Sequence, residues 1–347
     1  MASLGSGPTG GPKVSVVLPV RNGEGTLSAA VGSLRDQTLR EIEIVIVDDG
    51  STDGTPDLIR RLCREDHRVK YVRTLGRGIS AALNSGLREA RGRYIARMDA
   101  DDLSLPRRLE LQGEFLDRHP DFGLVACRLQ FGGDRRTSAG YAHYVDWTNT
   151  LTTHEEISLH RFVESPFAHP SVMFRRELLD RFGSYRDGDF PEDYELWLRW
   201  LEKGVRMEKL TEPLLVWNDS PERLSRTDPR YSPERFYEIK SGYLCRWLQE
   251  NNPFHPGIWL IGAGRTTRRR ARFLEALGVR IVAYVDIDPR KVGHLIQGRR
   301  VVHRNDTPSP GACFLLSFVG SRGAREEIRG FLEARGHLIG HDFLPAA

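Results

Sequence analysis

The chain has 347 residues, of which 39% are hydrophobic and 28% charged, so it is long enough for two domains and able to bury a core, which excludes a disordered chain. Its 51 Lys and Arg residues nearly balance 47 Asp and Glu residues, and the formal charge of +4 points to no class of partner by itself. No apolar run approaches the ~18 residues that a membrane span needs, and the Gly-, Ser- and Pro-rich residues 1–12 predict a flexible tail, not a signal peptide.

Strand and helix patterns alternate from residue 14 to residue 98. Val14–Val20 and Ile42–Val47 are nearly unbroken apolar runs, which is typical of strands buried on both faces of a parallel sheet. The other expected elements are strands at 69–72 and 93–98, and helices at 26–37, at 56–64 with a cap in 51–53, and at 78–90. This order predicts an α/β sandwich with a mostly parallel sheet, in which ligands bind at the carboxyl ends of the strands.

A second, smaller α/β pattern follows the breaker at residues 251–253. Before it, we expect a strand at 169–174 and helices at 194–203 and 232–249. After it, we expect strands at 258–261, 280–285 and 312–319, and helices at 268–277 and 324–334. The predicted organisation is a tail (1–12), a first domain (13–228), a helical linker (229–256) and a second domain (257–347).

Acidic residues follow two of the expected strands. Asp48-Asp49 follows the second strand, and Asp99-Ala100-Asp101-Asp102 follows the fourth. Carboxylate oxygens suit Mg²⁺ or Mn²⁺, which commonly bridge to substrate phosphates. A solvated turn in which Asp102 or Ser104 caps the next helix is the alternative, and the Asp-x-Asp pattern alone does not exclude it.

Five ordered segments carry a more specific pattern. They are VSVVLPVRNGE from Val14, IEIVIVDDGSTDGT from Ile42, GISAALNSGL from Gly78, GRYIARMDADD from Gly92 and PEDYELWLRWLEKG from Pro191. Together they resemble inverting glycosyltransferases of family 2, which have the nucleotide-sugar-binding GT-A fold. The resemblance extends from residue 14 to about residue 225 and implies an enzyme that transfers a sugar from a UDP-sugar.

The resemblance implies a nucleotide site at the ends of the first two strands. The implied nucleoside contacts are Pro19, Val20, Arg21, Asn22, Glu24 and Asp49, with Asp49 accepting a ring N–H of the base. Asp48 is either a further contact or a turn acid that bonds to Ser51 or Thr52. Arg77 is either a diphosphate contact or a solvated loop arginine. By the same resemblance, Asp99 and Ala100 hold the ribose or a metal-bound water.

A cation and a base are implied as well. Asp101, Asp102 or both would bind Mn²⁺ or Mg²⁺, which stabilises the charge on the departing UDP. Glu192 and Asp193 precede a helix, whose dipole favours ionised carboxylates. The resemblance assigns Asp193 as the base that deprotonates the acceptor hydroxyl, with Glu192 either supporting it or contacting the acceptor. An ordinary acidic helix N-terminus is the alternative.

The sequence departs from the family pattern at Trp217-Asn218-Asp219-Ser220. Many relatives have an aromatic-Arg-x-His segment there, whose histidine helps to bind the metal. Asp219 is a substitute oxygen ligand in our hypothesis, and the third ligand stays open. His169 and Trp217 are candidates for contacting the sugar or the acceptor, although a lone histidine is more often structural. Tyr144 and Trp147 lie in the variable stretch that usually meets the acceptor.

The second domain begins like a dinucleotide-binding fold. Gly262-Ala263-Gly264 follows an expected strand, and Asp286 lies near the spacing of a ribose-binding acid. However, Thr267 replaces the Gly or Ala of the sixth motif position, and about 90 residues is only half of a complete fold. We therefore expect a degenerate Rossmann-like module that binds no NAD.

Five arginines lie within eight residues at the start of this module: Arg265, Arg268, Arg269, Arg270 and Arg272. A solvated helix face is one interpretation, and contact with RNA or an anionic membrane is the other. Residues 258–347 carry 15 Lys and Arg against 8 Asp and Glu, a charge of +7. The whole arrangement resembles bacterial family 2 proteins with such a tail, and also animal queuosine-tRNA galactosyltransferases. Cell-surface glycan or glycoconjugate precursors, including lipid-linked ones, and tRNA are therefore the alternative acceptors.

The cysteines Cys63, Cys127, Cys245 and Cys313 form no Cys-x-x-Cys pair. This spacing predicts neither a disulfide framework nor a cysteine zinc site, and it favours a reducing compartment. We expect a cytoplasmic enzyme, either dispersed or peripheral at the inner face of the membrane, and we leave oligomerisation open. A non-catalytic nucleotide-sugar-binding protein is a further alternative, against which the intact acidic elements argue.

Overall fold

A computed structural model describes residues 11–220, 222–321 and 323–347 of the chain. Residues 1–10 of the predicted tail therefore lie outside the described residues. The chain divides into two compact units. The first comprises residues 1–154, 167–188 and 203–227, and the second comprises residues 155–166, 189–202 and 228–347. No helix in the described part of the chain is long and apolar enough to cross a membrane.

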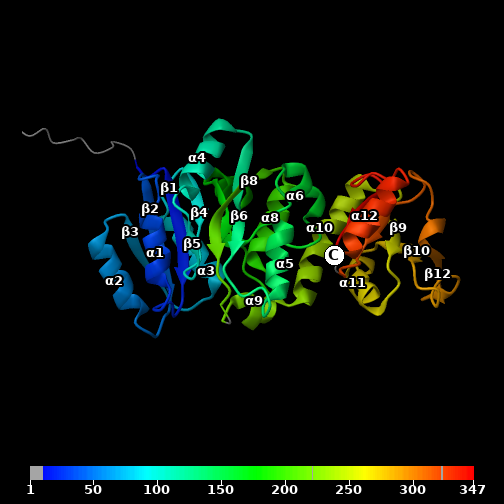
Figure 1. The fold of residues 1–347 in the computed structure, drawn as a ribbon, viewed down its shortest axis with the longest axis horizontal. Coiled ribbons are helices and arrows are strands. Elements are labelled where there is room, and N and C mark those ends of the chain that lie inside the picture. Colours follow the sequence, from blue (N-terminus) through cyan, green and yellow to red (C-terminus); the bar gives the residue numbers. More distant parts are fainter. Residues whose placement is uncertain (1–10, 221, 322) are drawn as a thin grey trace, which may run out of the picture. The chain divides into compact units, whose positions relative to one another are not determined.

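The first unit is built on an eight-stranded sheet in the order β3-β2-β1-β4-β7-β6-β8-β5 (Figure 1). Its strands are β1 (Val14–Val20), β2 (Ile42–Asp49), β3 (Val69–Thr74), β4 (Tyr94–Arg97), β5 (Leu103–Ser104), β6 (Phe122–Phe131), β7 (Met173–Arg175) and β8 (Arg206–Trp217). The first four strands pair in parallel, as do β6 and β8, whereas β7 is antiparallel to β4 and β6. The prediction of a mostly parallel α/β sheet is confirmed.

Helices connect these strands. They are α1 (Leu27–Arg35), α2 (Thr55–Glu65), α3 (Ile79–Glu89), α4 (Arg108–Arg118), α5 (Ala139–Thr148) and α7 (Glu177–Phe182). The short helix α9 (Leu224–Thr227) follows the last strand, β8. The residues that α1 buries are Leu27, Ala30, Val31 and Leu34, the apolar face expected from their spacing. β1 and β2 are buried along their whole length, as expected for strands covered on both faces.

Gly86 lets α3 approach β1 and β2 closely. A Cβ at this position would lie 2.6 Å from Val17 Cγ1 and 2.9 Å from Val47 Cγ2. We expect Gly86→Ala to lower the free energy of unfolding by about 1–3 kcal/mol through overpacking, measured by urea denaturation. Gly32→Ala in α1 is the matched control, because no atom lies within 4 Å of its added Cβ. The control is expected to stabilise the fold by about 0.4–1 kcal/mol, and equal effects of the two substitutions would contradict this packing.

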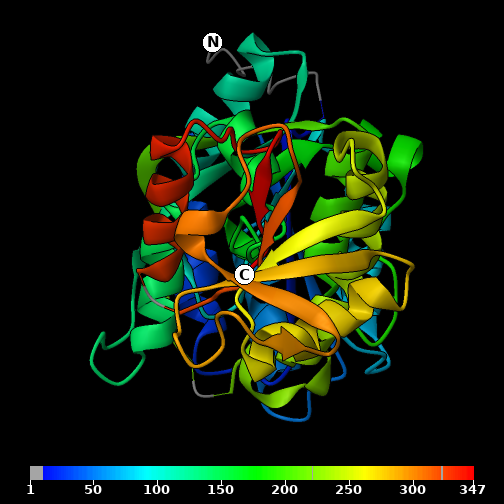
Figure 2. The ribbon, with the colours of Figure 1, turned by 90° about the vertical axis from the view of Figure 1, so that its right-hand side faces the viewer.

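The second unit has a six-stranded sheet in the order β11-β12-β10-β9-β13-β14 (Figure 2). Its strands are β9 (Gly257–Ile261), β10 (Arg280–Asp286), β11 (Leu295–Ile296), β12 (Arg299–His303), β13 (Leu315–Ser317) and β14 (Phe343–Pro345). Its helices are most of α6 (His154–His160), α8 (Glu192–Glu202), α10 (Pro233–Asn251), α11 (Arg265–Glu275) and α12 (Ala324–Ala334). All strand pairs except β11 with β12 are parallel. A second, smaller α/β unit is therefore present, and α8 groups with it.

Several local predictions were wrong. The N-cap of α2 is Gly54, because residues 51–53 bond to a neighbouring loop instead. The alternative in which Asp102 or Ser104 caps the next helix is not found, because the N-cap of α4 is Arg107. Of the strand expected at 169–174, the first three residues form a 3₁₀ turn, η1 (His169–Ser171), around Pro170. The strands β5, β6, β8, β11, β12 and β14 were not predicted.

Candidate active site

Two strand-end loops interlock at the carboxyl edge of the first sheet. β1 pairs in parallel with β2 on one side and with β4 on the other, so the loops after these three strands are neighbours. The Asn22 backbone N–H donates to Ser51 Oγ at 2.9 Å, and Asn22 Oδ1 accepts from the Thr52 N–H at 2.8 Å. Glu24 Oε2 accepts from the Gly54 N–H at 3.0 Å. These bonds fix the segment in which sequence analysis placed the nucleoside, with Arg21 exposed at its surface and Pro19 and Val20 buried in β1.

The two acids that end β2 have different roles. Asp48 is fully buried and accepts from the Ser51 N–H at 2.8 Å and from the Tyr71 hydroxyl at 2.9 Å. Asp48 therefore has the bonds expected of a turn acid, which was the alternative to a nucleotide contact. Asp49 accepts from Thr74 Oγ1 at 2.6 Å and from the backbone N–H groups of the next loop, at Arg77 (3.1 Å) and at Gly78 (2.9 Å). Asp49 thus shapes the loop that carries the exposed Arg77.

Three carboxylates gather where β4 ends. One oxygen from each of Asp99, Asp101 and Asp102 lies within 4.8 Å of the others, and we call these residues the acidic group. Asp99 Oδ1 pairs with Arg97 Nη2 at 2.7 Å. Burial, followed by the neighbouring Asp99 carboxylate, raises the pKa of Asp101, although the charges of Arg223 and Arg97 oppose the shift.

Asp102 is the most deeply buried member of the acidic group, with 0% exposure. Its Oδ1 accepts from the Asn218 N–H at 2.9 Å, whereas its buried Oδ2 has no hydrogen-bond partner among the described residues. Burial and the two neighbouring carboxylates raise its pKa well above the usual range. A buried carboxylate oxygen without a partner, beside two further acids, fits a hard divalent cation.

Asp219 lies outside the acidic group. Its carboxylate accepts from Arg226 Nη2 at 2.6 and 2.8 Å and from the Ser138 hydroxyl. These bonds keep its pKa below the usual value despite its burial. We therefore omit Asp219 from the proposed cation site. Its neighbour Asn218, which sequence analysis did not single out, instead donates through Nδ2 to the Asp101 carbonyl at 2.7 Å.

A fully buried arginine supports this edge of the sheet. Arg108 in α4 donates from Nη1 to the Pro170 carbonyl at 2.7 Å and from Nη2 to the Arg97 carbonyl at 3.1 Å. Burial lowers its pKa to about 10, so it remains charged at neutral pH. It joins the end of β4 to η1. Its position in a helix gave no sign of this role, because both partners are distant in sequence.

The candidate sugar-contacting side chains are mostly buried. His169 Nε2 lies 2.7 Å from the Tyr185 hydroxyl, and burial and then Arg97 hold the pKa of His169 well below its usual value. This histidine is therefore neutral at physiological pH. Trp217 is 7% exposed and packs in the core of the first unit. Its ring centroid is 5.7 Å from that of Tyr144, which in turn lies 6.1 Å from that of the half-buried Trp147.

Glu192 and Asp193 begin α8 and belong to the second unit. Glu192 is 3% exposed, and its Oε2 accepts from the Tyr231 hydroxyl at 2.7 Å. Asp193 Oδ1 accepts from the backbone N–H of Tyr194 at 2.7 Å. Burial and then the carboxylates Glu192 and Asp193 raise the pKa of Tyr231, so its hydroxyl stays protonated as a donor. The sequence gave no indication of Tyr231.

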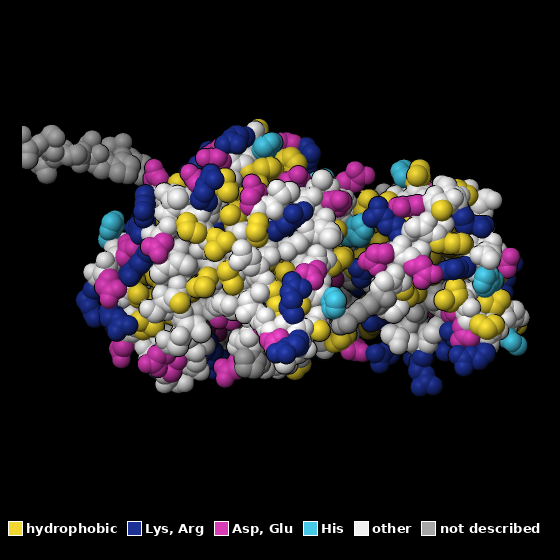
Figure 3. All heavy atoms as spheres, in the orientation of Figure 1, with side chains coloured by type: hydrophobic (Ala, Val, Ile, Leu, Met, Phe, Trp, Pro, Cys, Tyr) yellow, Lys and Arg dark blue, Asp and Glu magenta, His cyan; other side chains and the backbone are white. Residues whose placement is uncertain are grey.

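Asp286 holds the loop after β9 by a hydrogen bond to its backbone. Asp286 Oδ2 accepts from the Ala263 N–H at 2.8 Å and from Lys291 at 3.2 Å, and its Oδ1 accepts from two backbone N–H groups that follow it. The acid expected near a ribose is thus engaged with its own loop. Of the nearby arginines, Arg269 pairs with Glu234 at 3.2 Å. Figure 3 shows further Lys and Arg side chains among acidic ones along the lower edge of this unit.

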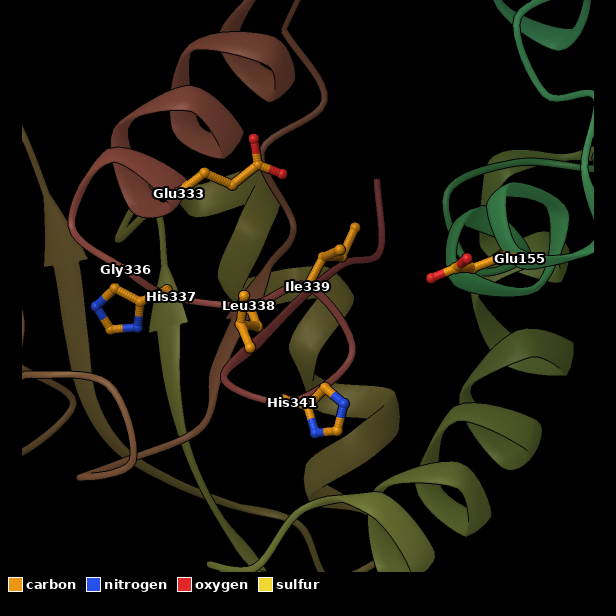
Figure 4. A pocket seen from close by; sticks show the side chains of 7 residues that line it. All are labelled: Glu155, Glu333, Gly336, His337, Leu338, Ile339 and His341. Atoms are coloured by element: carbon orange, nitrogen blue, oxygen red, sulfur yellow. The ribbon is translucent and has the colours of Figure 1, made fainter.

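A cavity of about 390 Å³ in the second unit holds none of the predicted site residues. It is lined by Glu155, Glu333, Gly336, His337, Leu338, Ile339 and His341 (Figure 4). The His337 ring turns away from Glu155 in this view, and His337 itself is 1% exposed. Because none of the residues predicted from the sequence lines this cavity, the strand-end loops of the first unit remain the candidate site.

Comparison with known proteins shows the family to which the chain belongs. The family model for glycosyl transferase family 2 matches residues 15–183. The putative glycosyltransferase EpsE of Bacillus subtilis (strain 168) is 32% identical over 231 residues, which are 64% of this chain and 78% of EpsE. The chain belongs to glycosyltransferase family 2. The O-antigen biosynthesis glycosyltransferase WbnJ of Escherichia coli is 27% identical over 241 residues, 68% of this chain and 89% of WbnJ.

Solved structures show the same fold. TarS 1-349 of S. aureus in complex with UDP-GlcNAc has a TM-score of 0.56 at 21% identity, over 76% of this chain and 70% of that one. Mannosyltransferase PcManGT from Pyrobaculum calidifontis, in complex with GDP-Man and Mn²⁺, has a TM-score of 0.51 at 24% identity, over 70% of this chain and 65% of that one. This family 2 glycosyltransferase thus has the GT-A fold.

Proposed function

We propose that this glycosyltransferase is a metal-dependent inverting enzyme that moves a hexose or N-acetylhexosamine from a UDP-sugar to an acceptor hydroxyl. The observation that carries the proposal is the acidic group, in which a buried Asp102 oxygen has no partner among the described residues. A divalent cation held there would act as a Lewis acid for the diphosphate leaving group. Complexes of similar folds with UDP-GlcNAc, and with GDP-Man and Mn²⁺, support this assignment.

Residues of the chain itself would bind the nucleoside and ribose and deprotonate the acceptor. The interlocked loops at Asn22 and Ser51 would hold the nucleoside, and Asp49 would accept a ring N–H of the base. Asp99 and the backbone at Ala100 would contact the ribose. Asp193, at the start of α8, would take the proton from the acceptor hydroxyl. The oxygen of that hydroxyl would attack the sugar carbon from the face opposite the leaving group.

Thermal shift with a panel of nucleotide sugars tests the donor assignment. We expect UDP-sugars with Mn²⁺ to raise the melting temperature, because a ligand that binds only the folded state stabilises it. GDP-, CDP- and ADP-sugars should have smaller effects. A larger shift with a GDP-sugar would refute UDP as the donor nucleotide while leaving the transferase assignment intact.

The acceptor has two candidates. WbnJ, which is named for O-antigen biosynthesis, favours a cell-surface glycan or lipid-linked precursor, made at the cytoplasmic face of the membrane. The arginines of α11 favour a polyanion such as tRNA, bound through the second unit, which we propose to be a Rossmann-like module without NAD. Transfer of a radiolabelled sugar into lipid extract, and not into tRNA, is expected; labelling of tRNA alone would reverse this choice.

Tyr231 provides a test of the acidic pair on α8. Removing its hydroxyl in Tyr231→Phe deprives Glu192 of a 2.7 Å hydrogen bond, so the pKa of Glu192 should rise. We expect kcat to fall about 10-fold. The acidic limb of the pH–rate profile should move to higher pH, because activity is lost where the Glu192 carboxylate becomes protonated.

Tyr243→Phe is the matched control for Tyr231→Phe. Tyr243 donates to Glu195, which lies further along α8, at 2.6 Å. This control should lower stability without moving the pH–rate profile. A profile that stays in place in Tyr231→Phe would show that Tyr231 has no influence on the catalytic pair.

A further inference from the structure

Arg223 lies just before α9 in the first unit, with its guanidinium over an aromatic ring. Its guanidinium carbon is 3.7 Å from the ring centroid of Trp217 and 5.5 Å from that of Tyr141. Because Trp217 is fixed in the core, the stack restricts the orientation of the guanidinium before any ligand binds. The Trp217 ring therefore stacks with the Arg223 guanidinium, and this contact takes the place of the predicted contact with a sugar.

Within the described part of the chain, one nitrogen of the Arg223 guanidinium has no acceptor, unlike the guanidinium of Arg226. The Nη1 atom of Arg223 is buried and has no hydrogen-bond partner among the described residues. Arg226, three residues later, is paired with Asp219 at 2.6 Å. Leaving a buried N–H without an acceptor costs about 1–3 kcal/mol, so such a group is expected where a ligand supplies the acceptor.

Arg223 is linked to the acidic group through the end of β8, because Trp217, over which it stacks, directly precedes Asn218 in the chain. Asn218 ties the end of β8 to this group, through the Asp102 carboxylate at 2.9 Å and the Asp101 carbonyl at 2.7 Å. The stacked cation and the acidic group therefore belong to one region of the first unit.

We propose that Arg223, held on Trp217, binds the diphosphate of the donor nucleotide as a second positive charge beside the cation of the acidic group. This assignment rests on the proposed function. A planar guanidinium can donate two parallel N–H bonds to non-bridging phosphate oxygens, a geometry that an ammonium cannot match. Arg223 thereby takes the role that sequence analysis gave to Arg77, whose side chain is exposed on a loop.

Calorimetric titration of the full chain with UDP, with uridine and with Mn²⁺ alone tests the assignment. In Arg223→Gln the Kd for UDP should rise about 10- to 100-fold, while the Kd for uridine stays within twofold, because only the phosphates lose a contact. Mn²⁺ alone should bind at least as tightly as in the wild type, since a nearby positive charge is removed. Arg223→Lys should recover part of the UDP affinity, and Arg226→Gln, the control, should keep it within twofold.

Two results would overturn the assignment. One is unchanged UDP affinity in Arg223→Gln. The other is a parallel loss of UDP, uridine and Mn²⁺ binding, which would mean that Arg223 only holds Trp217 in place. Failure of the proposed function has a different signature: the wild-type protein would bind none of UDP, GDP, CDP and ADP. If it binds one of these other than UDP, that nucleotide and its nucleoside replace UDP and uridine in the titration.

Discussion

Asp193→Asn should reduce sugar transfer by about 10³- to 10⁴-fold, because an amide cannot accept the proton of the acceptor hydroxyl. UDP affinity should stay within threefold of the wild type, since the proposed nucleotide contacts lie at other residues. The measurement is single-turnover transfer from a radiolabelled donor, combined with UDP titration. Transfer at the wild-type rate would remove Asp193 from the role of base.

A second acidic helix N-terminus provides the control for Asp193→Asn. Glu326 lies in the first turn of α12 and is exposed, so Glu326→Gln removes a charge from an equivalent helix position without a proposed role. We expect Glu326→Gln to retain full transfer activity. An equal loss in both variants would point to a general effect of charge at helix termini.

Asp102→Asn should separate stability from metal binding. Without metal, replacing a fully buried carboxylate among other carboxylates by a neutral amide should raise the melting temperature by several degrees, at about 2–4 °C per kcal/mol. The further rise that Mn²⁺ gives the wild type should disappear, together with at least about 99% of transfer activity. Differential scanning calorimetry with and without Mn²⁺ measures both effects.

Asp219→Asn is the comparison for Asp102→Asn. Asp219 was a metal candidate from its sequence position, yet it is paired with Arg226 and Ser138. Its substitution should cost stability but leave the Mn²⁺-induced rise in melting temperature. If Asp219→Asn abolished that rise and Asp102→Asn preserved it, the cation site would have to be moved from the end of β4 to the end of β8.

The parallel sheet was predictable because its signal is local. Val14–Val20 and Ile42–Val47 are continuous apolar runs, and such runs report burial on both faces. The acids after β2 and β4 followed from the same argument, as did the turn bond from Asp48 to Ser51, which spans only three residues. The site's nucleotide and catalytic assignments came from family resemblance and remain predictions.

The contacts that complete the site were not predictable, because they join residues far apart in the chain. Asn218 reaches Asp102 across 116 positions, and Arg108 reaches Pro170 across 62. Arg223 has no motif around it, and its stack on Trp217 exists only once β8 and the following turn are folded. Sequence position instead suggested Asp219, whose partner Arg226 forms a competing ion pair.

Release of UDP from a set of UDP-hexoses and UDP-N-acetylhexosamines, measured with and without Mn²⁺ in the absence of acceptor, tests the central claim most directly. We predict slow hydrolysis of at least one UDP-sugar that requires Mn²⁺ and is lost in Asp102→Asn. The account would be contradicted by a wild-type protein that releases no UDP and binds no UDP-sugar under either condition, or by release that is equal in the presence and absence of metal.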